Sequence, residues 1–499
     1  MPGDVFCPLV RSSPAWSVKP WREWMRRLAP RMIALNGAMR RKDPHRLNHD
    51  ARTNATAALR IIPREQHVIS RKNISKAALR VLYRLNEAGY QAYLVGGAVR
   101  DLLLGGHPKD FDVATNATPE EVKKLFRNSR LIGRRFRLAH VVYGPEIIEV
   151  ATFRGTGEED AGEGDRHIVD GRIVRDNVWG TIEEDAIRRD FRVNALYYDI
   201  SDFSVRDYVG GMPDVENRVL HLIGDPATRY REDPVRMLRA VRLAAKLNFR
   251  IDAKALAPFA ELGPLLADAA PARLFDESLK LFLAGHGLKS FHMLEQTGLL
   301  QFMFPATARA LKRGDQALRD LVEQGLANTD ARLAEGKSVT PAFLFAVLLW
   351  GEVRDLAHTW ITKGMESTAA WDRAAAQVVA EQCQRVAIPR RFTLTMEEIW
   401  ALQPRFEQIQ RKRVFRLMTH PRFRAAFDFL LLRAAESPAI SELGQWWAHA
   451  QQLPHETLAA ALANVPQGAA AELAAPAAKP RKRRRRKPAG KSGNKSDSV

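Results

Sequence analysis

The sequence predicts a mixed α+β head, in which helices flank a mixed sheet, followed by an all-α neck and body, with flexible basic segments at both ends. Strand-like runs alternate with short helical patterns between residues 73 and 208, whereas the apolar spacing from Glu232 to about residue 460 is helical almost throughout. The length of 499 residues leaves room for roughly two to four domains. Most of the excess positive charge lies near the two termini.

The head opens with a helix, a strand and a glycine turn. From Asn73 to Gly89 apolar residues recur every three or four positions, and Ser75 is placed to cap the helix that this spacing predicts. Gln91–Val95 is then predicted as a strand that ends at Gly96-Gly97. The same reasoning predicts helices at 98–104 and 119–126 and strands at 110–113, 140–143, 147–153, 196–200 and 204–208.

A polar stretch divides the head. Residues 155–172 are rich in Gly, Asp and Glu and poor in apolar residues, so we expect a mobile loop there. Thr181 and Glu184 have the spacing of a capping box, which predicts a helix from there to about Asn194. These boundaries divide the chain into a basic N-terminal extension (1–60), a head (61–225), a helical neck (226–300), a helical body (301–460) and a disordered basic tail (461–499).

The net charge of +20 points to a polyanionic partner, with nucleic acid first and an anionic membrane surface second. Residues 479–499 carry ten basic residues and one acid, and residues 1–52 carry eleven basic residues and four acids. The middle of the chain is therefore only mildly basic. We expect the C-terminal segment to bind phosphates without sequence preference. The apolar spacing around Trp24 fits either a short helix that touches membrane or RNA or a disordered start.

Several classes of protein are excluded by what the sequence lacks. Its two cysteines, Cys7 and Cys383, argue against a disulfide framework and a cysteine-based zinc site, and they suit a reducing cytoplasm. No apolar run approaches the roughly 18–20 residues of a membrane span, and no secretory signal is evident at the N-terminus. We therefore expect a cytoplasmic protein, with peripheral membrane contact left open.

The residues that point to chemistry are the run Gly96-Gly97-Ala98-Val99-Arg100-Asp101 and the pair Asp110 and Asp112. On a strand these two carboxylates lie on the same side while Phe111 points into the core. They repel each other unless a cation lies between them, and a hard, oxygen-bound ion such as Mg²⁺ fits best. The glycines let the backbone approach a phosphate, and the following helix offers free N–H groups. This combination is typical of phosphoryl or nucleotidyl transfer.

Five segments resemble the motifs of one family, in the family's order. They are Leu94-Val-Gly-Gly-Ala-Val-Arg-Asp101, Lys109-Asp-Phe-Asp112, Glu149-Val-Ala-Thr-Phe-Arg154, Arg188-Arg-Asp-Phe-Arg-Val-Asn-Ala-Leu196 and Arg231-Glu-Asp-Pro-Val-Arg-Met-Leu-Arg239. Over residues 62–300 the chain thus resembles the tRNA nucleotidyltransferase and bacterial poly(A) polymerase family. The resemblance implies a polymerase-β-like nucleotidyltransferase head as the catalytic part, a neck that recognises the base, and RNA contacts from neck and body.

The resemblance also implies a catalytic set of Asp110, Asp112 and Asp190, in which the first two hold two Mg²⁺ ions. Glu149 is a rival third carboxylate, because its strand is expected to border theirs. Asp190 and Asn194 are four residues apart and would share one face of the predicted helix.

In the neck, Asp233 reads locally as a helix cap before Pro234, but the resemblance gives it a second role. With Arg236 it would read the Watson–Crick edge of the incoming base, since no template strand is present. The candidate nucleotide-binding residues are Gly96, Gly97, Arg100, Asp101, Arg154, Arg189, Asn194, Asp233, Arg236 and Arg239.

Leu131-Ile-Gly-Arg-Arg-Phe-Arg-Leu-Ala-His-Val141 resembles a segment typical of bacterial poly(A) polymerases of type I. The expected activity is template-independent transfer of AMP from ATP to an RNA 3′-hydroxyl, with release of pyrophosphate. A CCA-adding tRNA nucleotidyltransferase is the alternative within the family, and a catalytically inactive RNA-binding protein is the alternative of another class. The expected partners of a monomeric chain are ATP and the 3′ ends of mRNA and other RNAs, with RNA-decay or RNA-chaperone proteins as further candidates.

Overall fold

The computed structural model describes residues 59–133, 137–155, 166–169, 172–176 and 178–463. Most of the two predicted basic ends and residues 134–136 of the segment Leu131–Val141 lie outside these ranges. No helix within the described ranges combines the length and the apolarity that crossing a membrane requires.

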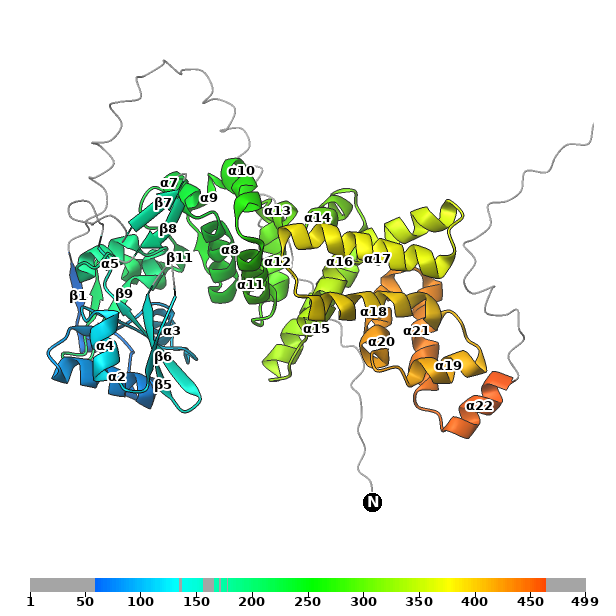
Figure 1. Ribbon diagram of the computed structural model, residues 1–499, viewed down its shortest axis with the longest axis horizontal. Helices are drawn as coiled ribbons and strands as arrows, with labels where there is room; N and C mark the ends of the chain where they lie inside the picture. Colours follow the sequence, from blue (N-terminus) through cyan, green and yellow to red (C-terminus); the bar gives the residue numbers. More distant parts are fainter. Residues whose placement is uncertain (1–58, 134–136, 156–165, 170–171, 177, 464–499) are drawn as a thin grey trace, which may run out of the picture. The chain divides into compact units, whose positions relative to one another are not determined.

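The head is built on an eight-stranded mixed sheet (Figure 1) with the order β1-β10-β9-β2-β3-β6-β5-β4. Strands β3 and β6 run parallel, and the other neighbouring pairs are antiparallel. The predicted mixed sheet is confirmed. Its strands are β1 (Arg60–Ile62), β2 (Ala92–Val95), β3 (Asp112–Thr115), β4 (Ser129–Ile132), β5 (Leu138–Tyr143), β6 (Glu146–Thr152), β9 (Leu196–Asp199) and β10 (Val205–Asp207).

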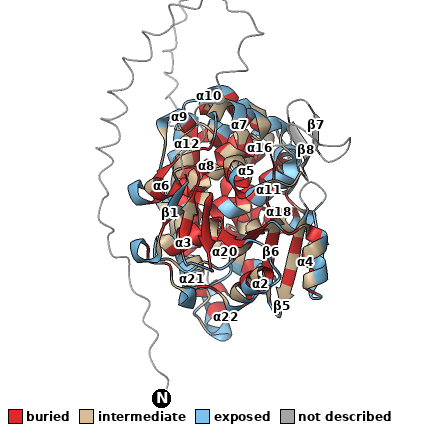
Figure 2. Ribbon diagram, turned by 90° about the vertical axis from the view of Figure 1, so that its left-hand side faces the viewer, coloured by how far each residue is buried: buried red, intermediate tan, exposed pale blue. Residues whose placement is uncertain are grey.

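The two faces of this sheet carry different helices. Helices α2 (Lys76–Glu87) and α4 (Pro119–Leu125) cover one face, and α5 (Ile182–Arg188) lies on the other. The alternation along β3 follows this division, because Val113 belongs to the core under α2 and α4 whereas Ala114 packs with residues of α5. The central strands β2 and β9 and the inner sides of the helices are buried (Figure 2). Asp112 lies two residues before Ala114 and points to the same side of β3, so it faces the α5 side of the sheet.

The helices of the head confirm the signals in their sequences. The Ser75 hydroxyl accepts a hydrogen bond from the Ala78 amide at 3.0 Å, and α2 ends before Gly89, whose φ is +85°. Helices α4 and α5 both begin with complete capping boxes, at Thr118 and at Thr181. Helix α3 (Gly97–Leu103) follows the glycine turn as predicted.

The rest of the described chain is largely helical. Two short parallel strands, β11 (Val219–Leu220) and β12 (Arg250–Ile251), pair beside the neck helices. The helices are α6 (Gly211–Asn217), α7 (Pro226–Glu232), α8 (Val235–Leu247), α9 (Ala253–Leu256), α10 (Phe259–Leu262), α11 (Pro271–Phe282), α12 (Gly287–Gln296), α13 (Leu300–Met303), α14 (Pro305–Lys312), α15 (Gln316–Ala334), α16 (Pro341–Thr362), α17 (Ser367–Arg385), α18 (Arg390–Phe406), α19 (Arg411–Met418), α20 (Phe423–Leu432), α21 (Pro438–Ala450) and α22 (His455–Ala463).

Three local predictions in the head are wrong. The stretch expected to be a loop contains β7 (Arg166–Val169), which pairs with β8 (Arg172–Asp176). The helix expected to reach Asn194 ends at Arg188, because Phe191 is extended and forms a β-bridge with Leu222. Strand β3 begins at Asp112 and not at 110, so Asp110 precedes the strand.

Candidate active site

The glycine turn passes directly beside two charged side chains. Gly96 has a φ of +77°, a conformation that strains any residue with a Cβ atom. A Cβ added there would lie 3.6 Å from Asp112 Oδ2 and 3.9 Å from Arg189 Nη1. The turn therefore brings backbone, a carboxylate and a guanidinium together at the start of helix α3.

Three carboxylates gather on this side of the sheet. Asp112 lies directly opposite Glu149 in the parallel register of β3 and β6, so both side chains point to the α5 side. Asp110 lies two residues earlier and is exposed, while Phe111 between them is buried as predicted. Glu149 is also 3.2 Å from His140 on β5.

The electrostatics of Asp112 show how closely these groups interact. Burial raises the pKa of Asp112 to about 6, and the carboxylates of Glu149 and Asp110 push it in the same direction against Arg189. A charged carboxylate in such surroundings gains from a nearby cation. Oxygen-only donors of this kind fit Mg²⁺, although within the described ranges no three His, Cys, Asp or Glu side chains are arranged as a metal site.

Arg189 is held in place by groups behind it. Its guanidinium donates to Asp185 Oδ2 at 2.9 Å and to the Tyr197 hydroxyl at 2.9 Å, and that hydroxyl donates to the same carboxylate at 2.7 Å. Burial alone would lower the pKa of Arg189, but Tyr197 and Asp185 hold it above its usual value. The amide of Arg154 donates to the other oxygen of Asp185 at 3.3 Å.

A second group of predicted residues forms one connected network. Arg100 donates to Asn194 Oδ1 at 2.5 Å, and Asn194 donates to Asp190 Oδ1 at 3.1 Å. Arg100 also pairs with Asp101. Asp190 and Asn194 thus interact as expected, although a 3-10 turn (Arg192–Asn194) and not a continuous helix connects them.

The same network reaches the neck through Asp190. Its Oδ2 accepts from Arg239 Nε of α8 at 2.9 Å. Burial would raise the pKa of Asp190, but Arg239, Asn194 and the Phe191 amide hold it well below its usual range. Of the two candidates for the third carboxylate, Asp190 contacts Arg239, Asn194 and this amide, whereas Glu149 lies opposite Asp112.

The proposed base-reading pair in the neck is also fixed by neighbours. Arg236 donates to Glu232 at 2.8 Å and to the carbonyl of Arg229 at 2.7 Å. Asp233 accepts from the Val235 amide at 3.3 Å and from Arg273 of α11 at 2.8 Å, but the N-cap position of α8 belongs to Pro234, so the expected cap at Asp233 is wrong. The pair is therefore oriented before any base is bound.

The basic side chains along α8 do not form a free cationic surface. Each has an acidic partner, and the four partners come from α3, the segment after α5, α7 and α11. The pairs are Arg236 with Glu232, Arg239 with Asp190, Arg242 with Glu277 and Lys246 with Asp101. Two of these acids belong to the head, so this face of α8 is a seam that attaches the neck helix to the head.

Sequence reasoning missed several residues that hold these groups. Asp185 lies four residues before Arg189, a spacing that suggests a helical ion pair. No comparable signal marks Arg229, whose guanidinium donates to the carbonyls of Arg188 and Arg189 at 2.8 and 2.7 Å, or Arg273. These carbonyls, and the Asp233 carboxylate that Arg273 meets, lie 40 or 41 residues away in the chain, although Arg229 also pairs locally with Glu232.

Comparisons with known proteins identify the family of this chain. Residues 92–221 match the family described as "Poly A polymerase head domain", residues 248–311 match "Probable RNA and SrmB- binding site of polymerase A", and residues 363–488 match "Polymerase A arginine-rich C-terminus". The chain is similar to poly(A) polymerase I of Salmonella typhi, with 55% identity over 399 residues that cover 78% of this chain and 85% of that protein.

More distant similarity extends to CCA-adding enzymes. The enzyme of Lactobacillus helveticus is 37% identical over 223 residues, which are 44% of this chain and 53% of that protein. The solved structure of the Thermotoga maritima CCA-adding enzyme complexed with tRNA shares the fold, with a TM-score of 0.53 at 19% identity over 79% of this chain and 86% of that one. With the higher identity over most of both chains, and with all three polymerase A regions matched, this chain belongs to the poly(A) polymerase I family.

Proposed function

We propose that this chain is a template-independent polynucleotide adenylyltransferase that adds AMP from ATP to RNA 3′-hydroxyl ends and releases pyrophosphate. The observation that carries the proposal is the placement of Asp112 opposite Glu149 and beside both the Gly96 turn and Arg189. The name of the 55% identical relative, poly(A) polymerase I, supports the choice of ATP and RNA as substrates. The matched RNA-binding and arginine-rich regions support RNA as the acceptor.

The carboxylates provide the metal-binding part of the mechanism. Asp110 and Asp112 would hold two Mg²⁺ ions, and Glu149 is the better candidate for the third carboxylate because it lies in register with Asp112. When bound, the ions would supply activation of the RNA 3′-hydroxyl and neutralisation of the triphosphate charge. We assign Asp190 a positioning role, because it orients Asn194 and Arg239.

The turn and the cations receive the triphosphate. The Gly96 turn leaves the first amides of α3 free to donate to phosphate oxygens, and Arg189 lies beside it as a fixed positive charge. Arg100 and Asp101 keep the start of α3 attached to Asn194 and Lys246. In this arrangement the 3′-hydroxyl attacks the α-phosphorus of ATP, and pyrophosphate leaves opposite to it.

The neck selects the base. Asp233 and Arg236 present an acceptor and a donor whose directions are set by Arg273 and by Glu232. A base that does not match leaves these groups unsatisfied, which costs binding free energy. Adenine would therefore be chosen by protein groups alone.

Primer extension with each nucleoside triphosphate separately tests this proposal. The purified chain and a short RNA primer should give a long product with ATP and almost none with CTP, GTP or UTP. A product that stops after C, C and A would favour the CCA-adding alternative, which the 37% identity to a CCA-adding enzyme keeps in view. RNA binding without any extension would favour the inactive alternative.

The proposed partners are RNA 3′ ends and ATP, and the proposed location is the cytoplasm. The resemblance of residues 248–311 to a probable RNA and SrmB-binding site makes a protein partner of the RNA-decay or RNA-chaperone type a further candidate for the neck region. Co-purification of a tagged chain from RNase-treated lysate would test that partner.

A further inference from the structure

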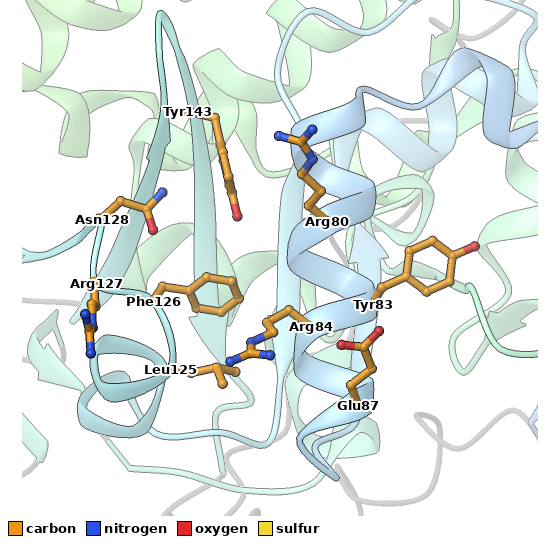
Figure 3. A pocket seen from close by; sticks show the side chains of 9 residues that line it. All are labelled: Arg80, Tyr83, Arg84, Glu87, Leu125, Phe126, Arg127, Asn128 and Tyr143. Carbon is orange, nitrogen blue, oxygen red and sulfur yellow. The ribbon is translucent and has the colours of Figure 1, made fainter.

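The head has a second basic site on the face of the sheet opposite to the carboxylates. A hollow of about 460 Å³ lies between α2, the segment after α4 and the end of β5 (Figure 3). Tyr143, which lines it, points to the same side as Ala139 and Val141 of the core under α2 and α4, whereas Asp112 and Glu149 point to the α5 side. The hollow is therefore separate from the proposed active site.

Three arginines and one acid, Glu87, line this hollow, and within the described part of the chain no ion pair joins Glu87 to any of the three arginines. Arg80 and Arg84 extend from α2 across it, and Arg127 lies on the opposite rim next to Asn128. All three are exposed, and none forms an ion pair with a carboxylate within the described ranges. The cations of the α8 seam are all paired, so these three differ in being free to meet an anion from outside.

Aromatic rings complete the hollow. The Arg80 guanidinium lies 6.0 Å from the centre of the Tyr143 ring, and the buried Phe126 lines the hollow between the two walls. Tyr83 stands at the edge, where its hydroxyl accepts from Arg71 at 2.9 Å. Guanidinium groups bind phosphate through paired hydrogen bonds, and exposed rings stack on bases, so this combination is typical of single-stranded nucleic-acid binding.

We propose that this hollow binds a single-stranded stretch of RNA upstream of the 3′ end, with phosphates on Arg80, Arg84 and Arg127 and a base against Tyr143. The volume lies within the roughly 300–1,000 Å³ of small-ligand sites, which is room for a nucleotide unit. An acidic peptide would satisfy the arginines but would leave the rings without a role. The inference rests on the proposed RNA-tailing function and adds a second contact that only longer RNAs reach, which raises their effective concentration at the active site.

The test compares two triple variants with equal loss of charge. Arg80→Ala, Arg84→Ala and Arg127→Ala together remove the hollow's cations, whereas Lys72→Ala, Lys123→Ala and Lys124→Ala remove three exposed cations of the head that do not line the hollow. Fluorescence anisotropy without ATP would measure binding of oligo(A) of about 6 and about 30 nucleotides. We expect the hollow variant to bind the long RNA about tenfold more weakly, with a shallower salt dependence, and to bind the short RNA and extend it normally.

Photo-crosslinking would show where on the protein the long RNA binds. Long RNA with a few 4-thiouridines should crosslink in wild type to peptides that contain Tyr83, Phe126 or Tyr143, and these crosslinks should disappear in the hollow variant. Equal losses of long-RNA affinity in both variants, or crosslinks confined to other peptides, would overturn the proposal. Binding of poly-glutamate that depends on the three arginines, without any change in RNA affinity, would overturn it in favour of an acidic protein partner. Because the anisotropy and crosslinking assays need no catalysis, a chain that binds RNA in this way but fails to incorporate AMP would contradict the proposed function alone.

Discussion

At Asp112 the stability of the folded protein and the proposed catalysis make the most clearly opposed demands. Burial and two neighbouring carboxylates raise its pKa to about 6, which means that its charge is unfavourable in the folded protein without a cation. Asp112→Asn should therefore lower AMP incorporation at least about a hundredfold, because the proposed metal-binding carboxylate loses its charge. The same change should leave the thermal unfolding midpoint equal or higher, since the repulsion disappears.

Three measurements on purified Asp112→Asn protein check this: the rate of AMP incorporation, the unfolding midpoint and the affinity for RNA. RNA affinity should remain at the wild-type level. A rate of incorporation close to that of wild type would remove Asp112 from the catalytic set.

Asp190 shows the opposite balance, because its contacts favour the charged form. Arg239, Asn194 and a backbone amide hold its pKa below the roughly 3.9 of an unfolded chain, despite burial. A depressed pKa in the folded state gives stability that is present above about pH 4 and is lost as the pH falls further. Asp190→Asn should thus cost about 2–3 kcal/mol of unfolding free energy at pH 7, and the difference from wild type should shrink between about pH 5 and pH 3.

Thermal unfolding of both proteins across this pH range tests the prediction. Asp202→Asn is the matched control, because the pKa of Asp202 is also lowered, by Ser204 against burial, while its side chain is half exposed. The control should change stability little at any pH. A constant difference between Asp190→Asn and wild type from pH 7 to pH 3 would contradict the assigned ion pair.

At the scale of elements, helix α8 connects the proposed base-reading residues to the head. Arg239 pairs with Asp190 of the head, whereas Arg242, three residues later on the same helix, pairs with Glu277 of α11. Lysine keeps the charge at either position but loses the forked geometry of the guanidinium. Arg239→Lys should therefore raise the KM for ATP several-fold more than Arg242→Lys, because only the former loosens the attachment of Asp233 and Arg236 to the triphosphate site.

The two variants should have similar unfolding midpoints. A difference in the KM for ATP would then report the positioning of the nucleotide and not a loss of stability. Equal KM values in Arg239→Lys and Arg242→Lys would mean that the seam does not position the nucleotide.

The elements that the sequence predicted correctly are those with local causes. The cap at Ser75, the capping boxes at Thr118 and Thr181 and the helical spacing of α2 all act within a few residues. The hairpin β7–β8 also had a local signal, since Asp170-Gly171 is flanked by Ile168-Val169 and Ile173-Val174, but the surrounding Gly and acidic residues obscured it.

What the sequence could not predict depends on partners far away in the chain. Helix α5 stops early because Phe191 pairs with Leu222, and the edge strand β1 exists only through its pairing with β10. In the site, motif positions were predictable, but Lys246 and Asp101 are 145 residues apart and no motif links them. A basic stripe on a helix looks the same in a sequence whether it binds RNA or carboxylates of its own chain.

At the scale of the whole molecule, the seam changes how the positive charge should be understood. The cations of α8 are neutralised internally, and the described cations that are free around a hollow lie on the far face of the head. Much of the charge of +20 remains at the chain ends, where residues 479–499 alone contain ten basic residues and one acid. RNA should therefore be attracted mainly by groups that take no part in the chemistry.

Deletion of residues 479–499, which lie outside the described ranges, tests this separation. For every phosphate that the truncated chain no longer neutralises, the slope of log affinity against log salt should become shallower by about 0.7 for single-stranded RNA. The truncated chain should therefore bind RNA more weakly at low salt and almost equally at high salt. The KM for ATP should not change, because the proposed triphosphate site consists of residues of the head. Since the tail and the hollow share no residues, combining the deletion with the three arginine changes should lower the binding free energy additively. A salt slope equal to that of the full-length chain would show that the tail does not bind RNA phosphates.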